Sequence, residues 1–283
     1  MNLLDRILRS RLAAFGLVVL AVVVTTALLA PFIAPHDPAA QDILSRLLPP
    51  MARSEIGLHV LGTDALGRDL LSRLMVGARV SLLVGIAAVS VAALLGVSIG
   101  LIAGYEDRRF GRLLMGLADV QLAVPFLVLI LAVIAVLGPS LLNLIVVLGA
   151  AHWVQYARVV RAETLALRER EFVQAAQALG AHTLRILLRH LLPNLTSSII
   201  VISSLLVARM ILYEASLSFL GLGVPARIPT WGGMIADGRS YMGNAWWVAA
   251  IPGLAIFMTV VAINLVGDRL RDLLDPKLRH AEK

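Results

Sequence analysis

The chain has 283 residues, of which 59% are hydrophobic and only 15% charged, and its mean hydropathy is +0.87. So few charges cannot cover a water-facing globule, because soluble domains carry about 25% charged residues. Cysteine is absent, which excludes disulfides and thiolate metal sites. The net charge of +7 would suit nucleic acid, but in a membrane protein excess arginine reflects topology, so we expect the lipid bilayer and no nucleic acid as a partner.

Six apolar segments are long enough to cross a bilayer, whose hydrocarbon core of ~30 Å needs about 20 helical residues. In chain order they are residues 12–33, 80–104, 113–137, 141–157, 195–213 and 245–266. The first is longer than the apolar region of a signal peptide, and no small-residue cleavage site follows it. In the second, Gly85, Gly96 and Gly100 would let a neighbouring helix approach closely. The sequence therefore predicts an all-α membrane protein with six transmembrane helices.

The distribution of positive charge orients these segments, because Lys and Arg close to a span resist translocation. With a cytosolic N-terminus, residues 1–11, most of the 25 Lys and Arg residues fall on the cytosolic side. This orientation puts the loop 158–194 and the C-terminal tail 268–283 in the cytosol. Residues 34–79 then form an external segment.

The predicted cytosolic loop contains the polar stretch EFVQAAQALGAHTLRILLRHLLP, residues 171–193. Its first helix, 171–179, places four residues at i, i+3, i+4 and i+7 on one face: Phe172, Ala175, Ala176 and Leu179. Gly180 suits the left-handed position that ends a helix, and Pro193 is expected to close a second helix, 182–192. That helix has a leucine face and a basic face, formed by Leu184, Leu187, Leu188 and Leu191 and by His182, Arg185 and Arg189. Such an elbow either rests on lipid headgroups or docks a cytosolic partner, which the small alanines would let approach the backbone.

The same stretch resembles the cytosolic loop of ABC-importer permeases. The pattern of that family is matched here by Ala175, Ala176, Gly180, Leu192 and Pro193. Gln174 stands where the family has Glu, with Glu171 one turn earlier, and His190 stands where it has Ile. The pieces EFVQAA, LGA and RHLLPN resemble the peptide/nickel branch. Further motifs resemble its C-type permease subunit in the same order: LGTDALGRDLLSRLMVGARVSL (61–82), EASLSFLGLG (214–223), PTWGGMI (229–235) and GDRLRDLLDPK (267–277).

The resemblance implies a type I ABC importer permease fold, in which residues 77–267 form a core with five transmembrane helices. It also implies a bacterial inner-membrane protein that pairs with a second, homologous permease subunit, two cytosolic ATPases and an external solute-binding protein. No G-x-x-x-x-G-K-[ST] motif occurs, so we expect a non-catalytic subunit without a cofactor, with ATP and Mg on the ATPases. The residues expected to couple to an ATPase are Glu171, Phe172, Gln174, Ala175, Ala176, Gly180, Arg185, Arg189 and Pro193.

Three polar residues of the predicted spans are candidates for lining or gating the pathway: Asp119, Gln121 and Glu214. Asp119 and Gln121 precede Pro125, which we expect to kink the third span, and they either line the pathway or pack helices together. Glu214 either gates the outer end near a peptide's amino group or forms an inter-subunit or headgroup ion pair. Arg209 lies in the same span as Glu214, five residues earlier.

The external segment either forms a platform for the binding protein or packs as a lid over its own spans. Within it, Asp69 and Arg73 are spaced i, i+4 on a predicted helix, which favours an ion pair. No metal site is predicted, because the histidines are scattered along the chain: His36, His59 and His152. Three tryptophans match the aromatic belt of a membrane interface: Trp231, Trp246 and Trp247.

Two other classes of function compete with an importer subunit. A proton-coupled secondary transporter acting alone would need buried acids and an inverted repeat, but only Asp119 and Glu214 are available and no repeat is detectable. A scaffold without transport gives no reason for glycine-rich spans. The sequence leaves the solute open among oligopeptides, dipeptides, D-amino-acid dipeptides, glutathione and nickel, with a short peptide as the first choice.

Overall fold

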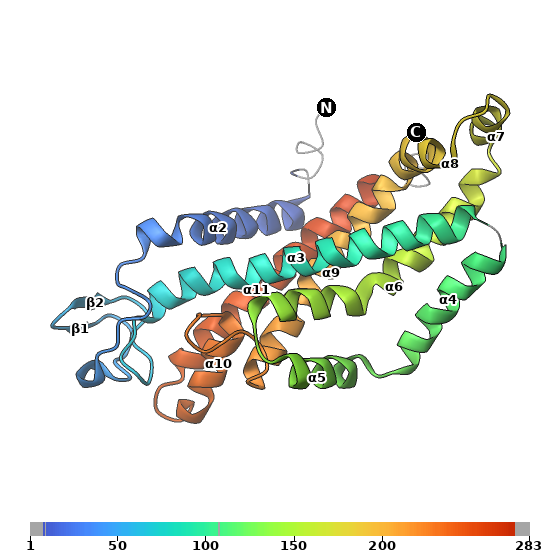
Figure 1. Ribbon diagram of the computed structural model, residues 1–283. Helices are drawn as coiled ribbons and strands as arrows, with labels where there is room; N and C mark the ends of the chain where they lie inside the picture. The colour runs from blue at the N-terminus through green and yellow to red at the C-terminus, as the bar shows by residue number, and fades with distance from the viewer. Residues whose placement is uncertain (1–7, 9, 107, 275–283) are drawn as a thin grey trace.

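The computed structural model describes residues 8, 10–106 and 108–274, and over this range the protein is a bundle of helices (Figure 1). Most of the predicted N-terminal segment 1–11 and the end of the predicted tail, 275–283, lie outside the described residues. The helices are α2 (Arg11–Ile33), α3 (Leu70–Tyr105), α4 (Arg108–Ala123), α5 (Phe126–Leu137), α6 (Leu141–Arg168), α7 (Glu171–Ala178), α8 (Thr183–Arg185), α9 (Leu192–Phe219), α10 (Trp231–Gly238) and α11 (Trp247–Leu274).

Four helical stretches are long and apolar enough to cross a membrane: α2, α3, Thr183–Phe219 and α11. The predicted third span is broken rather than kinked, because α4 and α5 meet at an angle of 88°. Pro125, which lies at the break, cannot donate a backbone hydrogen bond and disfavours helix in the residue before it. The pair α4–α5 would make a fifth span. The predicted count of six is not established, because α6 carries Asn143, His152 and Gln155 among its apolar residues.

The longest helix, α3, packs against α6 along a stripe of glycines. Gly96, Gly100 and Gly104 are spaced four residues apart and so share one face of α3. A Cβ atom added to Gly100 would lie 2.8 Å from the carbonyl oxygen of Ala157 and 2.8 Å from Cβ of Val160. The predicted close approach of a neighbouring helix is therefore confirmed for Gly96 and Gly100, and α6 is the neighbour.

The two ends of the bundle differ in structure (Figure 1). At one end, which we call the hairpin end, residues before α3 form a short antiparallel pair, β1 (Ala52–Ser54) with β2 (Gly57–His59), which an all-α prediction did not include. A buried cluster that includes Leu70, Trp231 and Val248 packs α10 and α11 against α3. At the other end, which we call the elbow end, α7 and α8 project beyond α3 and α6.

We predict that Gly100→Ala destabilises the folded protein by about 1–3 kcal/mol, the usual range for overpacking a close contact. Gly253→Ala in α11 is the matched control, because a Cβ there meets nothing within 4 Å. Alanine is the better helix former by about 1 kcal/mol, so the control is expected to be neutral or stabilising. Thermal unfolding in detergent measures both variants. Equal unfolding temperatures would contradict the steric role of the glycine stripe.

Candidate functional site

The elbow begins with α7, which ends in a Schellman motif. The N–H of Ala181 donates to the carbonyl oxygen of Ala176 at 3.0 Å, and the N–H of Gly180 donates to that of Gln177 at 2.9 Å. Gly180 has a φ of +76°, so its predicted left-handed role is confirmed. A Cβ atom at this position would meet nothing within 4 Å. Glycine is therefore favoured here by the backbone conformation and not by lack of space.

The second arm of the elbow does not end where predicted. From α8 the chain passes through a π-helical turn, Ile186–Leu191, directly into α9, so that residues Thr183–Phe219 form one continuous helical stretch. Pro193 lies in the first turn of α9 and does not close a helix. In the π-helical turn the N–H of Leu192 donates five residues back, to Leu187. This wider turn is the kind of local adjustment that accommodates a proline, which has no N–H to donate.

The face predicted for α7 is split in the structure. Val173 and Ala176 are buried, whereas Phe172, Ala175 and Leu179 are exposed, Leu179 by 88%. The predicted leucine face is also divided, because the π-helical turn changes the direction of successive side chains: Leu187 and Leu191 are buried, but Leu184 and Leu188 are more than half exposed. We give the name elbow surface to the exposed apolar and basic residues of the two arms, which are Phe172, Ala175, Leu179, Leu184, Arg185, Leu188 and Arg189.

The inner side of the elbow is fixed to the ends of α3 and α6. Val173, Ile186 and Leu191 join a buried cluster with Leu101 of α3 and Val160 of α6. The Nε2 atom of Gln177 donates to the hydroxyl of Tyr105 at 3.0 Å, which ties α7 to the end of α3. The two remaining polar candidates, Glu171 and Gln174, are exposed, and Gln174 donates to the carbonyl of Glu169. The elbow is thus a packed extension of the bundle.

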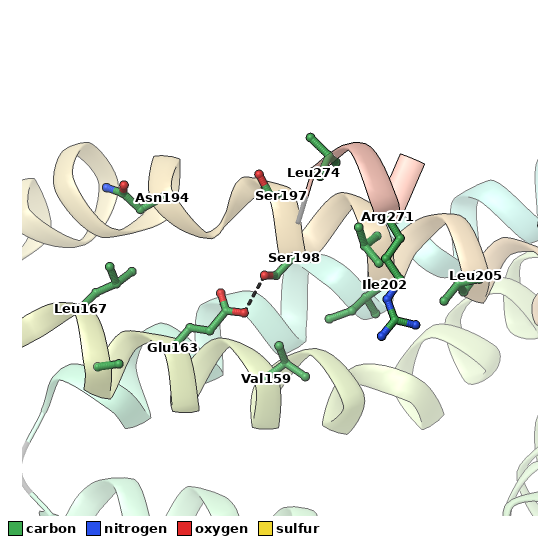
Figure 2. Close-up of a pocket in the computed structure, with 12 residues that line it drawn as sticks. Val159, Glu163, Leu167, Asn194, Ser197, Ser198, Ile202, Leu205, Arg271 and Leu274 are labelled. Carbon is green, nitrogen blue, oxygen red and sulfur yellow. Dashed lines mark hydrogen bonds between the residues drawn. The ribbon is translucent and has the colours of Figure 1, made fainter. Parts of the chain in front are cut away.

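A cavity of about 670 Å³ opens between α6, α9 and α11 (Figure 2). Glu163 of α6 and Ser198 of α9 meet in its wall, where the hydroxyl of Ser198 donates to Oε1 of Glu163 at 2.6 Å (Figure 2). Arg271 extends into it from α11. A second hollow of about 200 Å³ lies beside it, and the two share wall residues Val159, Ile202 and Leu205. We call the two together the groove.

The sequence-based pathway candidates do not line this groove. Asp119 accepts a hydrogen bond from Arg158 at 2.6 Å, in an exposed ion pair between α4 and α6. Gln121 donates to the carbonyl of Ala151 at 2.8 Å and accepts from the indole N–H of Trp153 at 2.7 Å. Both residues therefore hold α4 against α6, which is the helix-packing alternative.

Glu214 is fully buried between α3 and α9. Its carboxylate accepts hydrogen bonds from the hydroxyls of Ser81 at 2.8 Å and Ser218 at 2.7 Å. Because α9 turns this residue toward α3, the structure places it away from the surfaces that a lipid headgroup or a second subunit would contact. The carboxylate is therefore hydrogen-bonded within this chain.

The groove contains two polar residues of α6 that no sequence motif indicated, together with Arg209, which the sequence placed in the same span as Glu214. Gln155 and Glu163 are spaced eight residues apart on α6, with Val159 between them, and so lie on one face of the helix. Arg209 comes from α9 and lines the smaller hollow. Two signals in the sequence could have indicated this groove. Gln155 and Glu163 form a polar stripe at helical spacing in an apolar helix, and Arg209 is a charge inside a predicted span.

At the hairpin end, the structure brings together two histidines that the sequence separates, so the expectation that they lie apart is wrong. The hairpin folds His59 back against the start of α3, where its ring stacks on that of His36 with centroids 4.8 Å apart. Nδ1 of His59 lies 2.9 Å, and Nδ1 of His36 3.6 Å, from Oδ1 of Asp69. Two imidazoles and a carboxylate are donor types that zinc uses in proteins. His152 lies apart from them in α6.

The predicted ion pair between Asp69 and Arg73 is also wrong. Asp69 is the N-cap of α3 and accepts from the backbone N–H of Ser72 at 2.8 Å, so its carboxylate points at the helix end. Arg73 lies instead between Asp64, at 3.4 Å, and Asp237 of α10, at 3.3 Å. Arg68 contacts the same two carboxylates, at 2.7 and 3.0 Å. We call these four residues (Asp64, Arg68, Arg73, Asp237) the arginine network, and it joins the external segment to α10.

Four helical stretches long and apolar enough to cross a bilayer, with a groove open between α6, α9 and α11, are the architecture of a membrane protein. The chain belongs to the family of binding-protein-dependent transport system inner membrane components, whose family model matches residues 96–280. Residues 3–50 match the N-terminal transmembrane domain of oligopeptide transport permease C. The resemblance inferred from the motifs is thereby confirmed, and the protein is an ABC transport permease.

Similar proteins transport peptides and related compounds, according to their names. The chain is 45% identical over 268 residues to the di/tripeptide transport system permease protein DppC of Pseudomonas aeruginosa, covering 94% of this chain and 88% of that protein. It is 39% identical to the probable D,D-dipeptide permease DdpC of Escherichia coli, covering 95% and 88%. It is 41% identical to the glutathione permease GsiD of Pectobacterium atrosepticum, covering 97% and 90%.

A solved structure shares the fold. A chain of the MetNI methionine ABC transporter, in an inward-facing conformation, superposes with a TM-score of 0.58 at 18% identity, covering 73% of this chain and 98% of that one. The predicted permease fold is therefore confirmed.

We predict that Asp64→Asn destabilises the protein, because it leaves two buried arginines with only the partly exposed Asp237 as an anionic partner. Breaking a buried ion pair costs on the order of 3–5 kcal/mol. Glu55→Gln, at an exposed position in the hairpin turn, is the matched control and is expected to be neutral. Denaturant unfolding in detergent measures both. Identical midpoints would show that the arginine network does not stabilise the fold.

Proposed function

We propose that this chain is the permease subunit of an ATP-driven importer of short peptides. Relatives that are 39–45% identical over nearly the whole chain, and that are named for di- and tripeptides or D,D-dipeptides, support the solute class. The observation that carries the mechanism is the continuous helical stretch Thr183–Phe219, which joins the elbow surface to a wall of the groove.

In the proposed importer, this chain pairs with a second, homologous permease subunit, and the two enclose the pathway. Two ATPases bind at the elbow end and hold ATP and Mg, while a solute-binding protein delivers peptide at the hairpin end. The chain itself is non-catalytic and binds no cofactor. It lies in a bacterial inner membrane with both termini in the cytosol, an orientation that the positive-inside rule supports.

The elbow surface suits an ATPase because it combines exposed apolar side chains with two cations. Phe172 and Ala175 of α7 and Leu179, its C-cap, are exposed on one side, whereas Val173 is buried. Arg185 and Arg189 add positive charge on the second arm. Since the inner side of the elbow is packed on α3 and α6, a displacement of the elbow passes into the bundle and is not absorbed by a loose loop.

The stiffness of the second arm links this displacement to the groove. Asn194, Ser198, Ile202 and Leu205 follow the arm along α9 and form one wall of the larger cavity. A rigid movement of the arm therefore moves this wall relative to α6. In the mechanism we propose, closure of the ATPases swings this wall and opens the groove toward the hairpin end.

A secondary transporter acting alone would need an acidic residue that is free to bind and release protons, and neither Glu214 nor Asp119 supports this alternative. Glu214 is held by serine hydroxyls inside the subunit, and Asp119 is paired with Arg158 at the surface. A carrier of protons would need an acid that alternates between the two sides of the membrane.

We predict that Ala175→Trp uncouples ATP hydrolysis from uptake and releases the ATPases on purification, because the bulky side chain holds a docked partner away. Ala40→Trp, the same change at an exposed alanine in the external segment, is the control and is expected to keep the ATPases bound. Co-purification and vesicle uptake measure the two effects. Normal uptake by Ala175→Trp with the ATPases retained would refute docking at this surface.

Gly180→Pro tests the same proposal through the backbone. Proline cannot adopt a φ of +76° or donate to the carbonyl of Gln177, so the angle between the two arms must change. We expect the variant to fold and insert, because position 180 meets no neighbouring side chain, but to lose coupled uptake.

A further inference from the structure

Arg209 occupies an unusual place for a charged residue. It lies inside the stretch Thr183–Phe219, which is long and apolar enough to cross a membrane, ten residues or about 15 Å before the end of α9. Its side chain is exposed at the surface of this chain and lines the smaller hollow of the groove with Gln155. An arginine at this depth is stable only when it faces water or a counter-ion.

The described part of the chain supplies no carboxylate as that counter-ion. None of its ion pairs includes Arg209. Glu214 is five residues further along α9 and is turned toward Ser81 and Ser218. Glu163 is two turns from Gln155 along α6 and is hydrogen-bonded to Ser198. The guanidinium is therefore available to an anion that enters the groove.

We propose that Arg209 and Gln155 form a subsite for the C-terminal carboxylate of a peptide that passes through the groove. The subsite rests on the proposed function, because it names the group by which the permease holds its solute. A guanidinium presents two parallel N–H donors that match a carboxylate, and the amide of Gln155 adds a donor from the facing helix. Val159, Leu205 and Leu206 line the same hollow and provide apolar walls for a side chain.

The position of the subsite favours a solute over an acidic residue of the second subunit. The hollow continues past Val159, Ile202 and Leu205 into the larger cavity, so an anion at Arg209 has a route along the groove. Every linear peptide ends in a carboxylate whatever its side chains are. A subsite for this group therefore lets one pathway accept peptides of many sequences, while a single arginine at an exposed position still allows release.

The test uses a thiol beside Arg209 in the assembled importer. This chain has no cysteine, so Leu205→Cys, one helical turn from Arg209, gives it a single thiol in the same hollow. We expect free dialanine to slow the labelling of this thiol by a small polar maleimide about threefold or more, because charge-assisted contacts hold the peptide there. Dialanine amide, which lacks the carboxylate, is expected to have no effect.

Adding Arg209→Gln to Leu205→Cys is expected to abolish protection, and Arg209→Lys to retain part of it because the charge remains. Arg227→Gln, at an exposed arginine outside the groove, is the control and is expected to leave protection unchanged. Equal protection by acid and amide, protection that survives Arg209→Gln, or no protection by either compound would overturn the subsite. Loss of the second permease subunit on Arg209→Gln would instead assign the arginine to a subunit ion pair and also overturn it.

Uptake of dialanine by the unaltered importer tests the proposed function separately. Uptake without selective protection would refute only the subsite. Absence of uptake for any peptide would refute the peptide importer itself.

Discussion

The close contact between α3 and α6 determines where the groove and the elbow surface lie. Because Gly96, Gly100 and Gly104 have no side chains, the backbone of α6 can pack directly on α3, and its polar face is left on the other side. That face carries Gln155 and Glu163 and forms one wall of the groove. The elbow packs against the ends of the same two helices. One helix contact thus positions both the groove and the elbow surface.

The second connection between these surfaces is α9, whose π-helical turn keeps the helix continuous through Pro193. A helix that ended at this proline would have produced a hinge between the elbow and the groove. The continuous stretch instead joins the two surfaces rigidly. Along its length come exposed leucines and arginines, then the groove wall, then Arg209, and finally the buried Glu214.

Local signals in the sequence predicted local structure well. Hydrophobic length located the long spans, and Gly180 was correctly assigned to a left-handed helix end because that role depends on a few neighbouring residues. Predictions that depended on distant contacts were less successful. Arg73 pairs with Asp64 and Asp237 and not with its helical neighbour Asp69. Folding brings these two carboxylates close to Arg73, and their positions cannot be read from local spacing. The leucine face of the second arm was misassigned since an α-helical period does not anticipate a π-helical turn. In α7, which is regular, contact with α3 and α6 buries Val173 in place of the predicted face.

The arginine network also bears on how the protein is made. Arg68 and Asp237 are separated by 169 residues, with several apolar helices between them. During synthesis Arg68 reaches the hairpin end long before α10 exists, so its second carboxylate partner arrives only after most of the bundle has been inserted. The final closure of this end therefore needs every intervening helix in place, because the two halves of the arginine network come from opposite ends of the chain.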